Sequence, residues 1–417
     1  MPDPADERAR AAAEDVARRS YGKLVAYLAA RTRDVAGAED ALADALTAAL
    51  TDWPAHGVPR NPEAWLMTVA RRSRLDRHRR ETTAAKAAGH LRLIADEIMS
   101  EADATTEIPD RRLALMFACA HPAVEASARA PLILQTILGF DAAAIAAAFL
   151  VSPAAMGQRL ARAKSKIRLA GIPFHVPAAS ELAERLDTVL EAIYAAYTEG
   201  WSEPSGADPR RRELAGEAVW LGRLVVALMP EAPEALGLLA LMLYLESRRA
   251  ARRDAAGAYV PLAVQDTARW DDTMIAEAES LLTQANRLPG SGRYQIEAAI
   301  QSAHAIRRIT GSADWTAILA LYDALIALTG SSVAAVNRAV ALGEVEGPQA
   351  GLAALDALAA DQQLAAFQPY LAARAELLAR CGNVVAAAAA YRRAIALETD
   401  PAVLAFLKSR IGHNVLN

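Results

Sequence analysis

Cysteine is nearly absent from this chain, because only Cys119 and Cys381 among its 417 residues carry a thiol. Two cysteines cannot build a disulfide framework, so we expect the protein in the reducing cytoplasm. The first ten residues, MPDPADERAR, are charged and lack the apolar segment of a signal peptide. No stretch reaches the roughly 18 uncharged apolar residues of a membrane helix, so we expect no membrane partner.

Sequence signatures of catalysis are also missing. The chain has no Gly-rich phosphate loop, no GxSxG, no HExxH and no Cys pair at metal spacing. Cys119 and His121 are neighbours in FACAHPAV, but two ligands without a further cluster favour a buried thiol and a capping histidine over a metal site. The polar stretch VQDTARWDD suits a small-ligand site or, as we favour, a turn that locks two helices. The sequence predicts neither an enzyme nor a metal or other cofactor.

Strand-like alternation is scarce, and aromatic residues make up 5% of the chain. Alanine dominates instead, and apolar residues recur at i, i+3 and i+4, which predicts an all-α fold. The length suggests two to four domains. Residues 1–177 hold 24 Lys or Arg against 21 Asp or Glu, a net +3, and the remainder has a net −7. A basic front and an acidic rear are typical of a nucleic-acid module joined to a regulatory one.

Residues 141–168, DAAAIAAAFLVSPAAMGQRLARAKSKIR, predict two helices with a tight turn between them. Ser152 can cap the second helix, and Pro153 suits its first position. One face of this helix is apolar and another is basic. The apolar positions are Met156, Leu160, Ala163 and Ile167, and the second face holds Ala155, Arg159, Arg162 and Lys166. The first helix, with Ile145 and Phe149 inward, should end near Leu150, which gives a helix-turn-helix. A solvated amphipathic hairpin is the alternative.

A second basic element lies at residues 61–81, NPEAWLMTVARRSRLDRHRRE. Asn61 should cap a helix with Pro62 at its first position. Its early turns are apolar through Trp65, Leu66, Val69 and Ala70, and Arg71, Arg72, Arg74, Arg77, Arg79 and Arg80 follow. Six guanidinium groups on about three turns repel one another unless phosphates or carboxylates neutralise them. A solvated helix end is the alternative.

Two further features precede this element. TDWPAHGVPRN reads as a Pro- and Gly-rich loop whose Trp53 and His56 could hold an extruded base. AGAEDALADALTAAL reads as a helix from about Ala38, with Glu39, Asp40 and Asp44 on one side and Leu42, Leu46 and Leu50 on another. The acids suit either the dipole of the first turn or docking to a basic partner.

In this order, AEDALADALTAAL, NPEAWLMTVARRSRLDRHRR and LILQTILGFDAAAIAAAFLVSPAAMGQRLARAKSKIR resemble three helical segments of the extracytoplasmic-function sigma factors of bacterial RNA polymerase. These segments are the core-binding helix, the melting helix and the helix-turn-helix. Ala43 stands where many members have Gln. Later segments, among them YAAYTEGW and GRYQIEAAIQSAHA, resemble the extension of a subgroup that ends in tetratricopeptide-like repeats.

The repeats are also visible in the sequence itself. CGNVVAAAAAYRRAIAL places Gly382, Ala387, Tyr391 and Ala394 at the offsets of a tetratricopeptide turn and second helix. Gly347 lies 35 residues earlier, and Ala313 another 34. This period predicts stacked helical hairpins whose concave side can hold a peptide or protein ligand, with stacking that binds no ligand as the alternative.

The resemblance implies an all-α chain of five segments. Residues 8–85 would be sigma region 2, 86–106 an acidic linker and 107–175 sigma region 4. Residues 178–285 would be a helical extension domain, and 286–417 tetratricopeptide-like repeats. Such a protein makes no bonds itself. Its partners would be core RNA polymerase and promoter DNA, and the extension would modulate its activity.

The resemblance also implies roles for individual residues. Glu39, Asp40 and Asp44 would bind core polymerase. The −10 element would be held and melted by Trp53, His56, Asn61, Arg71, Arg72, Arg74 and Arg77. The −35 element would be bound by the recognition helix through Ser152, Ala155, Gln158, Arg159, Arg162, Lys164 and Lys166. Gln158 suits adenine and Arg159 guanine, whereas Arg162, Lys164 and Lys166 suit phosphates.

A helix-turn-helix repressor with a helical repeat domain that senses a ligand or peptide is the alternative function. Both proteins would have the helix-turn-helix, but only a sigma factor needs the acidic core-binding helix and the Arg-rich melting helix.

Overall fold

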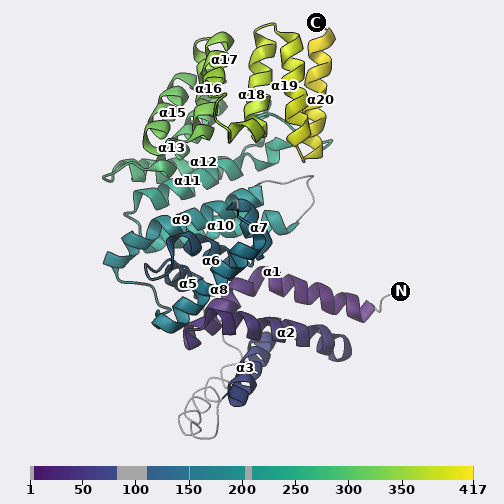
Figure 1. The fold of residues 1–417 in the computed structure, drawn as a ribbon, viewed down its shortest axis with the longest axis vertical. Helices are drawn as coiled ribbons and strands as arrows, with labels where there is room; N and C mark the ends of the chain where they lie inside the picture. The colour runs from purple at the N-terminus through teal and green to yellow at the C-terminus, as the bar shows by residue number, and fades with distance from the viewer. Residues whose placement is uncertain (1–3, 82–109, 150, 202–208, 417) are drawn as a thin grey trace. The chain divides into compact units, whose positions relative to one another are not determined.

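The computed structural model describes residues 4–81, 110–149, 151–201 and 209–416. Its regular elements are helices, and in these ranges no β-strand occurs beyond an isolated bridge between Arg253 and Tyr259. The predicted all-α fold class is therefore confirmed. Figure 1 shows the helices from the purple N-terminal end to the yellow C-terminal end. The chain divides into two compact units, Met1–Ala196 and Tyr197–Asn417. The acidic linker expected at 86–106 lies outside the described residues.

Unit 1 contains the segments that the sequence assigned to nucleic acid. Its helices are α1 (Pro4–Thr32), α2 (Val35–His56), α3 (Pro62–Glu81), α5 (Arg112–Cys119), α6 (Ala126–Leu138), α7 (Ala142–Ala148), α8 (Pro153–Ala170) and most of α9 (Ala179–Trp201). The chain reverses between α1 and α2 at Arg33, whose φ of 54° is left-handed, and Asp34 caps α2 by accepting from the Gly37 amide. The two helices pack along each other through buried aliphatic residues such as Leu28 and Leu42.

Helix α2 differs from its expected bounds at both ends. It begins at Val35, so Glu39 and Asp40 lie in its second turn. They are therefore not the first-turn acids that would interact with the helix dipole. It also continues through Pro54 to His56, so the expected loop placement of Trp53 and His56 is wrong. The reason is tertiary packing: the Trp53 side chain is 1% exposed and meets Trp65 of α3 edge to face, with ring centroids 5.5 Å apart.

The two helices predicted at 141–168 are present as α7 and α8. Ser152 caps α8 as predicted, because its Oγ accepts from the Ala155 amide at 3.2 Å. The predicted apolar face is also confirmed, since Met156, Leu160, Ala163 and Ile167 are all buried. Gly171 closes the helix in the left-handed conformation. Helices α6 and α7 pack against α8.

Unit 2 is a succession of helices in which most pack against their neighbours along the chain. They are α10 (Pro209–Leu228), α11 (Pro233–Ser247), α12 (Asp272–Asn286), α13 (Arg293–Ala305), α14 (Arg307–Thr310), α15 (Trp315–Thr329), α16 (Ser332–Val345), α17 (Pro348–Ala357), α18 (Gln368–Arg380), α19 (Val384–Leu397) and α20 (Pro401–Leu416). Four short 3-10 helices join them: η2 (Arg249–Arg252), η3 (Leu262–Val264), η4 (Thr267–Arg269) and η5 (Leu364–Ala366).

Helix α11 is the centre of the first part of unit 2. It is apolar around its circumference, as expected of a helix covered on all sides, and α10, α12 and α13 pack on it. In the part of the chain that the structure describes, no helix combines the length and the apolarity needed to cross a membrane. The predicted turn in VQDTARWDD is confirmed: Asp271 caps α12 by accepting from the Met274 amide, and Trp270 is buried beside Arg307.

In the second part of unit 2, α18, α19 and α20 stand side by side (Figure 1). Gly382 adopts a φ of 79° directly before α19, and Ala387, Tyr391 and Ala394 are buried, as the repeat pattern predicts. Gly347, before α17, has a φ of 100°. The two glycines therefore mark turns that favour residues without a Cβ.

The division into units differs from the expected domain bounds. It falls inside α9, at Ala196, whereas the sequence placed a boundary near 178. The first part of α9 belongs to unit 1 because Arg185 is buried there and donates to the Phe117 carbonyl at 3.2 Å. The boundary expected after residue 285 lies inside unit 2 and stays a prediction.

Candidate nucleic-acid interface

Helix α8 presents part of its predicted recognition surface to solvent. Ala155, Gln158, Arg162 and Lys166 are exposed. Arg159 is half-buried, and its Nη1 donates to the Ser127 carbonyl at 3.3 Å. The exposed positions repeat every three or four residues, so they share one side of the helix, opposite the buried face.

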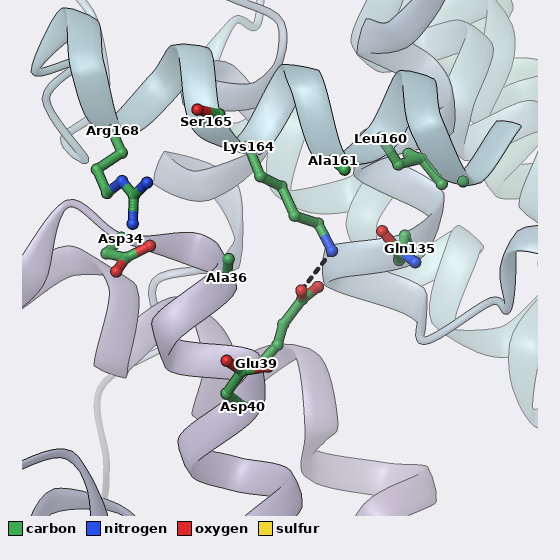
Figure 2. A pocket seen from close by; sticks show the side chains of 11 residues that line it. Asp34, Ala36, Glu39, Asp40, Gln135, Leu160, Ala161, Lys164, Ser165 and Arg168 are labelled. Atoms are coloured by element: carbon green, nitrogen blue, oxygen red, sulfur yellow. Dashed lines mark hydrogen bonds and ion pairs between the residues drawn. The ribbon is translucent and has the colours of Figure 1, made fainter. Parts of the chain in front are cut away.

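Lys164 is the exception on this helix. Its Nζ forms an ion pair with Glu39 of α2, which lies 125 residues earlier in the chain (Figure 2). Only 12% of the Lys164 side chain and 14% of the Glu39 side chain are exposed. Burial raises the pKa of Glu39, and the charge and hydrogen bond of Lys164 oppose that rise. The second carboxylate oxygen, Oε1, is buried without a hydrogen-bond partner among the described residues.

A cavity of about 350 Å³ lies beside this ion pair, between α2 and α8. Carboxylates line it from α2 and its cap, and cations line it from α8. The charged lining residues are Asp34, Glu39, Asp40, Lys164 and Arg168. Figure 2 shows the Arg168 guanidinium extended toward Asp34. The α2–α8 contact is therefore polar and open, in contrast to the apolar packing of α8 on α6 and α7.

A second contact joins the helices α1–α3 to the helices α5–α8. Gly22 of α1 is buried against α6, and a Cβ built at Gly22 would lie 1.9 Å from the Ile137 carbonyl oxygen. Tyr21 lies against Gly139, where the chain leaves α6. Two helical backbones can approach this closely only where a side chain is missing. Gly22 is not among the residues predicted from the sequence, although an isolated glycine inside a helical pattern is a signal of close packing.

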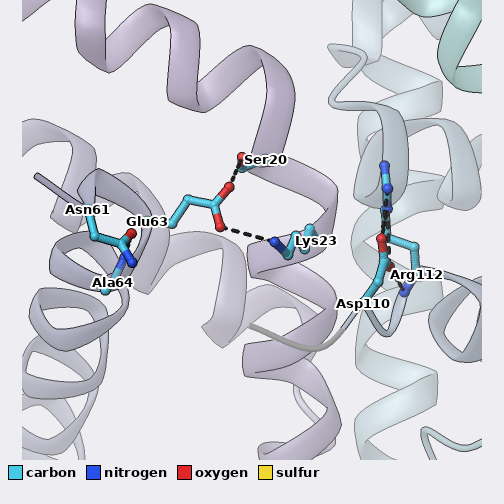
Figure 3. Close-up of polar contacts among 7 residues, drawn as sticks. All are labelled: Ser20, Lys23, Asn61, Glu63, Ala64, Asp110 and Arg112. Carbon is cyan, nitrogen blue, oxygen red and sulfur yellow. Dashed lines mark hydrogen bonds and ion pairs between the residues drawn. The ribbon is translucent and has the colours of Figure 1, made fainter. Parts of the chain in front are cut away.

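The Arg-rich helix α3 is held against α1 at its first turn (Figure 3). Asn61 caps it as predicted, accepting from the Ala64 amide at 3.1 Å. Glu63 accepts from Ser20 Oγ at 2.5 Å and from Lys23 Nζ at 3.1 Å, both on α1. These hydrogen bonds hold the first turn of α3 against α1. They therefore set the direction of the α3 axis, along which the arginines follow. Figure 3 also shows Asp110 bound to Arg112 at the start of α5.

The arginines of α3 differ in their surroundings. Arg71 donates to the Tyr27 hydroxyl at 3.3 Å and lies 5.7 Å from the centre of that ring. Arg72 is exposed, and Arg74 is half-buried with interactions of its own. The side chain of Arg77 lies outside the described residues. Of the three arginine side chains that the structure describes here, Arg72 is thus the most accessible to an outside phosphate.

The two residues expected to capture a base do not lie together on a loop. Trp53 is enclosed, so its ring offers no face to a base. His56 is exposed at the end of α2 and pairs with Asp52 at 3.0 Å. Gly57, with a φ of 87°, ends the helix, and residues 57–61 form the actual loop before α3. His56 precedes this loop, and Asn61 is its last residue.

The acids of α2 also separate. Asp40 and Asp44 are exposed, and Asp44 accepts a hydrogen bond from Ser73 of α3 at 2.5 Å. Glu39 is turned to α8 instead. The predicted polymerase-binding set is therefore split between two exposed carboxylates, Asp40 and Asp44, and the largely buried carboxylate of Glu39.

Cys119 and His121 have structural surroundings, as predicted. The Cys119 thiol is buried 3.7 Å from Thr136 Oγ1, and burial raises its pKa to about 12. His121 Nδ1 accepts from the Ala123 amide at 3.0 Å. Within the described ranges, no group of three His, Cys, Asp or Glu side chains is placed to hold a metal ion.

Comparison with known proteins identifies two segments of the chain. Residues 16–83, which span most of α1, α2 and α3, match the family model of sigma-70 region 2. Residues 185–286 match a family of unknown function (DUF6596). The chain is 39% identical over 404 residues to an uncharacterized protein of Rhizobium meliloti (strain 1021), covering 94% of this chain and 93% of that one. No solved structure matches it.

Proposed function

This chain belongs to the same family as the uncharacterized protein of Rhizobium meliloti, and from its sigma-70 region 2 at residues 16–83 we propose that it is a sigma factor of the extracytoplasmic-function group. A sigma factor binds core RNA polymerase, recognises the promoter and promotes melting; it is not itself an enzyme. The region 2 match is the observation that carries the proposal.

In the proposed mechanism, unit 1 holds all the promoter contacts. The exposed carboxylates Asp40 and Asp44 of α2 dock on core polymerase. Arg71, Arg72, Arg74 and Arg77 of α3 neutralise the phosphates of the −10 region, and His56 and Asn61 flank the base-capturing loop. Trp53 has no place in this step because it is buried. These contacts hold separated strands by charge and stacking, which suits melting because every base has a stacking face.

Helix α8 is proposed to enter the major groove of the −35 element as the recognition helix of sigma region 4. The exposed Ala155 and Gln158 lie in its first turns, which face base edges, and Arg159 lies next to them. Arg162 and Lys166 meet phosphates, which set the register of the helix without selecting a sequence. Lys164 joins them once it is released from Glu39.

Unit 2 is proposed to modulate the promoter binding and melting of unit 1. The protein is proposed to act in the cytoplasm. Its helices after α13 are proposed to be tetratricopeptide-like, with a groove for a peptide or protein ligand. The turns at Gly347 and Gly382 and the buried side chains of α19 support this part of the proposal.

Binding assays with purified core polymerase test the function. The full chain should comigrate with core polymerase on a gradient and should bind a duplex promoter fragment specifically only in its presence. Asp40→Lys should weaken the polymerase complex, and Asp323→Lys, a charge reversal of an exposed side chain in α15, should not. Specific duplex binding without polymerase, and no comigration, would instead identify a helix-turn-helix repressor.

A further inference from the structure

Unit 2 contains a buried cation, Arg248, directly after the last turn of α11. Its side chain belongs to a residue that is 7% exposed. Nη2 donates to Gln301 Oε1 of α13 at 2.6 Å, whereas Nη1 is buried without a hydrogen-bond partner among the described residues. The carboxylate nearest along the chain, Glu246, pairs with Arg249 instead, at 2.6 Å. A buried guanidinium whose described partner is a neutral amide is costly, so a negative partner would stabilise it.

Trp270 adds a second open donor beside this cation. The residue is 4% exposed, and its indole Nε1 is buried with no hydrogen-bond partner in the part of the chain that the structure describes. The Arg248 Cζ lies 5.9 Å from the centre of the Trp270 ring, so the two open donors belong to one cluster. Folded proteins rarely leave buried donors unpaired. Two of them in one place therefore indicate an acceptor from outside the chain.

The cluster also carries positive charge beyond that of Arg248. The Arg307 Cζ lies 5.4 Å from the centre of the Trp270 ring, and its guanidinium donates to the backbone carbonyls of Leu262 and Gln265, which are neutral. Burial, with Arg252 and Arg307 nearby, lowers the pKa of Arg248 to about 10, so its guanidinium stays charged at neutral pH. The missing acceptor should therefore be an anion.

We propose that unit 2 binds a chloride ion through Arg248 Nη1 and Trp270 Nε1. Both open groups are donors, so the ligand needs to accept only, and both are buried, so it has to be small. A monatomic anion meets these conditions, whereas a carboxylate or phosphate brings further oxygens that each need a partner. The ion would link the end of α11 to the segment that follows η4. The inference is independent of the proposed function, because both residues lie in unit 2 and outside the promoter contacts.

Hydrogen–deuterium exchange of the full chain tests the site. Exchange is compared in sodium chloride, sodium gluconate and sodium phosphate at equal ionic strength. Chloride should slow the exchange of amides in α11, α13 and α14 relative to the two larger anions, and the protection should grow with chloride concentration as mass action requires. Helix α2 of unit 1 is the internal reference, and its exchange should be the same in all three salts.

Two matched pairs of variants identify the residues. Trp270→Phe keeps an aromatic ring beside Arg248 and removes the N–H, so about tenfold more chloride should be needed for the same protection. Trp65→Phe, the same change in unit 1, should leave the chloride requirement unchanged. Arg248→Gln should remove the chloride dependence, and Arg287→Gln, which neutralises an exposed arginine after α12, should not. Trp270→Phe retains the charge of the cluster, so it tests the site even where Arg248→Gln does not fold.

The outcomes decide the inference. Protection by chloride that weakens in Trp270→Phe and persists in the two control variants supports it. Equal exchange in chloride and gluconate overturns it, because water or nothing then meets the open donors. The same chloride requirement in wild type and Trp270→Phe also overturns it. Protection by phosphate without protection by chloride would assign the cluster to an oxyanion and would equally contradict the proposal.

Discussion

Gly22 of α1 lies so close to Ile137 of α6 that a Cβ at position 22 would be 1.9 Å from the Ile137 carbonyl oxygen. The two residues belong to helix groups that the sequence places in different functional regions. Their contact, the packing of α1 on α5 and the Glu39–Lys164 ion pair join these groups within one compact unit.

A methyl group at Gly22 should therefore loosen this contact. Gly22→Ala should lower the free energy needed to open the contact between α1 and α6 by about 1–3 kcal/mol, which is the usual cost of overpacking. Gly157→Ala is the matched control: this glycine of α8 has nothing within 4 Å of a built Cβ, so alanine should stabilise its helix by about 0.5–1 kcal/mol. Hydrogen–deuterium exchange of the full chain measures both. Equal protection of α1 in wild type and Gly22→Ala would show that the crossing of α1 and α6 leaves room for a methyl group at position 22.

Gln158 and Arg162 should separate sequence selection from affinity. Gln158→Ala should reduce discrimination at one base pair of the −35 element by about 1–3 kcal/mol. Arg162→Ala should weaken binding of all sequences alike and reduce the salt slope of log affinity by about one. Titrations of the polymerase complex with promoter variants at several salt concentrations measure both effects. Loss of sequence preference in Arg162→Ala would contradict the assignment.

Trp53 and His56 should behave differently although they lie three residues apart. Trp53→Ala removes a buried ring that packs on Trp65, so it should destabilise unit 1 by about 3–5 kcal/mol. His56→Ala changes an exposed side chain, so stability should persist while promoter opening falls by about fivefold, equal to ~1 kcal/mol of stacking. Thermal unfolding and permanganate footprinting of the bubble distinguish the two. A stable Trp53→Ala with a selective opening defect would restore the loop interpretation.

His304 should make unit 2 sensitive to acid. Burial, with Arg248 and Arg307 nearby, lowers its pKa from 6.5 to about 4, and its ring meets Trp315 edge to face. The unfolded chain therefore binds the proton more readily, so stability is complete above about pH 6.5 and declines as the pH falls toward 4. At pH 5 the loss should reach up to about 2 kcal/mol.

His304→Phe keeps an aromatic ring beside Trp315 and removes the titration. Urea unfolding at pH 7 and pH 5 should thus show a smaller difference for this variant than for wild type. The same pH dependence in both proteins would assign the acid sensitivity to other groups.

Local signals in the sequence were enough to predict α8. Ser152 and Pro153 mark its start, and a 3.6-residue period selects the residues that the structure buries. The same reasoning failed at the end of α2, where Pro54 and Gly57 indicate a loop but the enclosure of Trp53 keeps the helix intact to His56. Local composition competes with tertiary packing there, and packing prevails.

The candidate site was predictable in its parts but not in its assembly. Glu39 and Lys164 were each assigned to an outside partner, because nothing within a few residues of either one shows that they meet across 125 positions. Contacts of that span depend on how helices cross, and the crossing depends on Gly22, a residue that carries no charge or side chain to draw notice.

Transcription from a promoter library with purified core polymerase tests the central claim most directly. The full chain should direct initiation downstream of a shared pair of sequence elements, and Arg72→Ala should reduce it several-fold, whereas Arg19→Ala, an exposed arginine of α1 paired with Asp15, should not. Initiation no different from that of core polymerase alone would contradict the account.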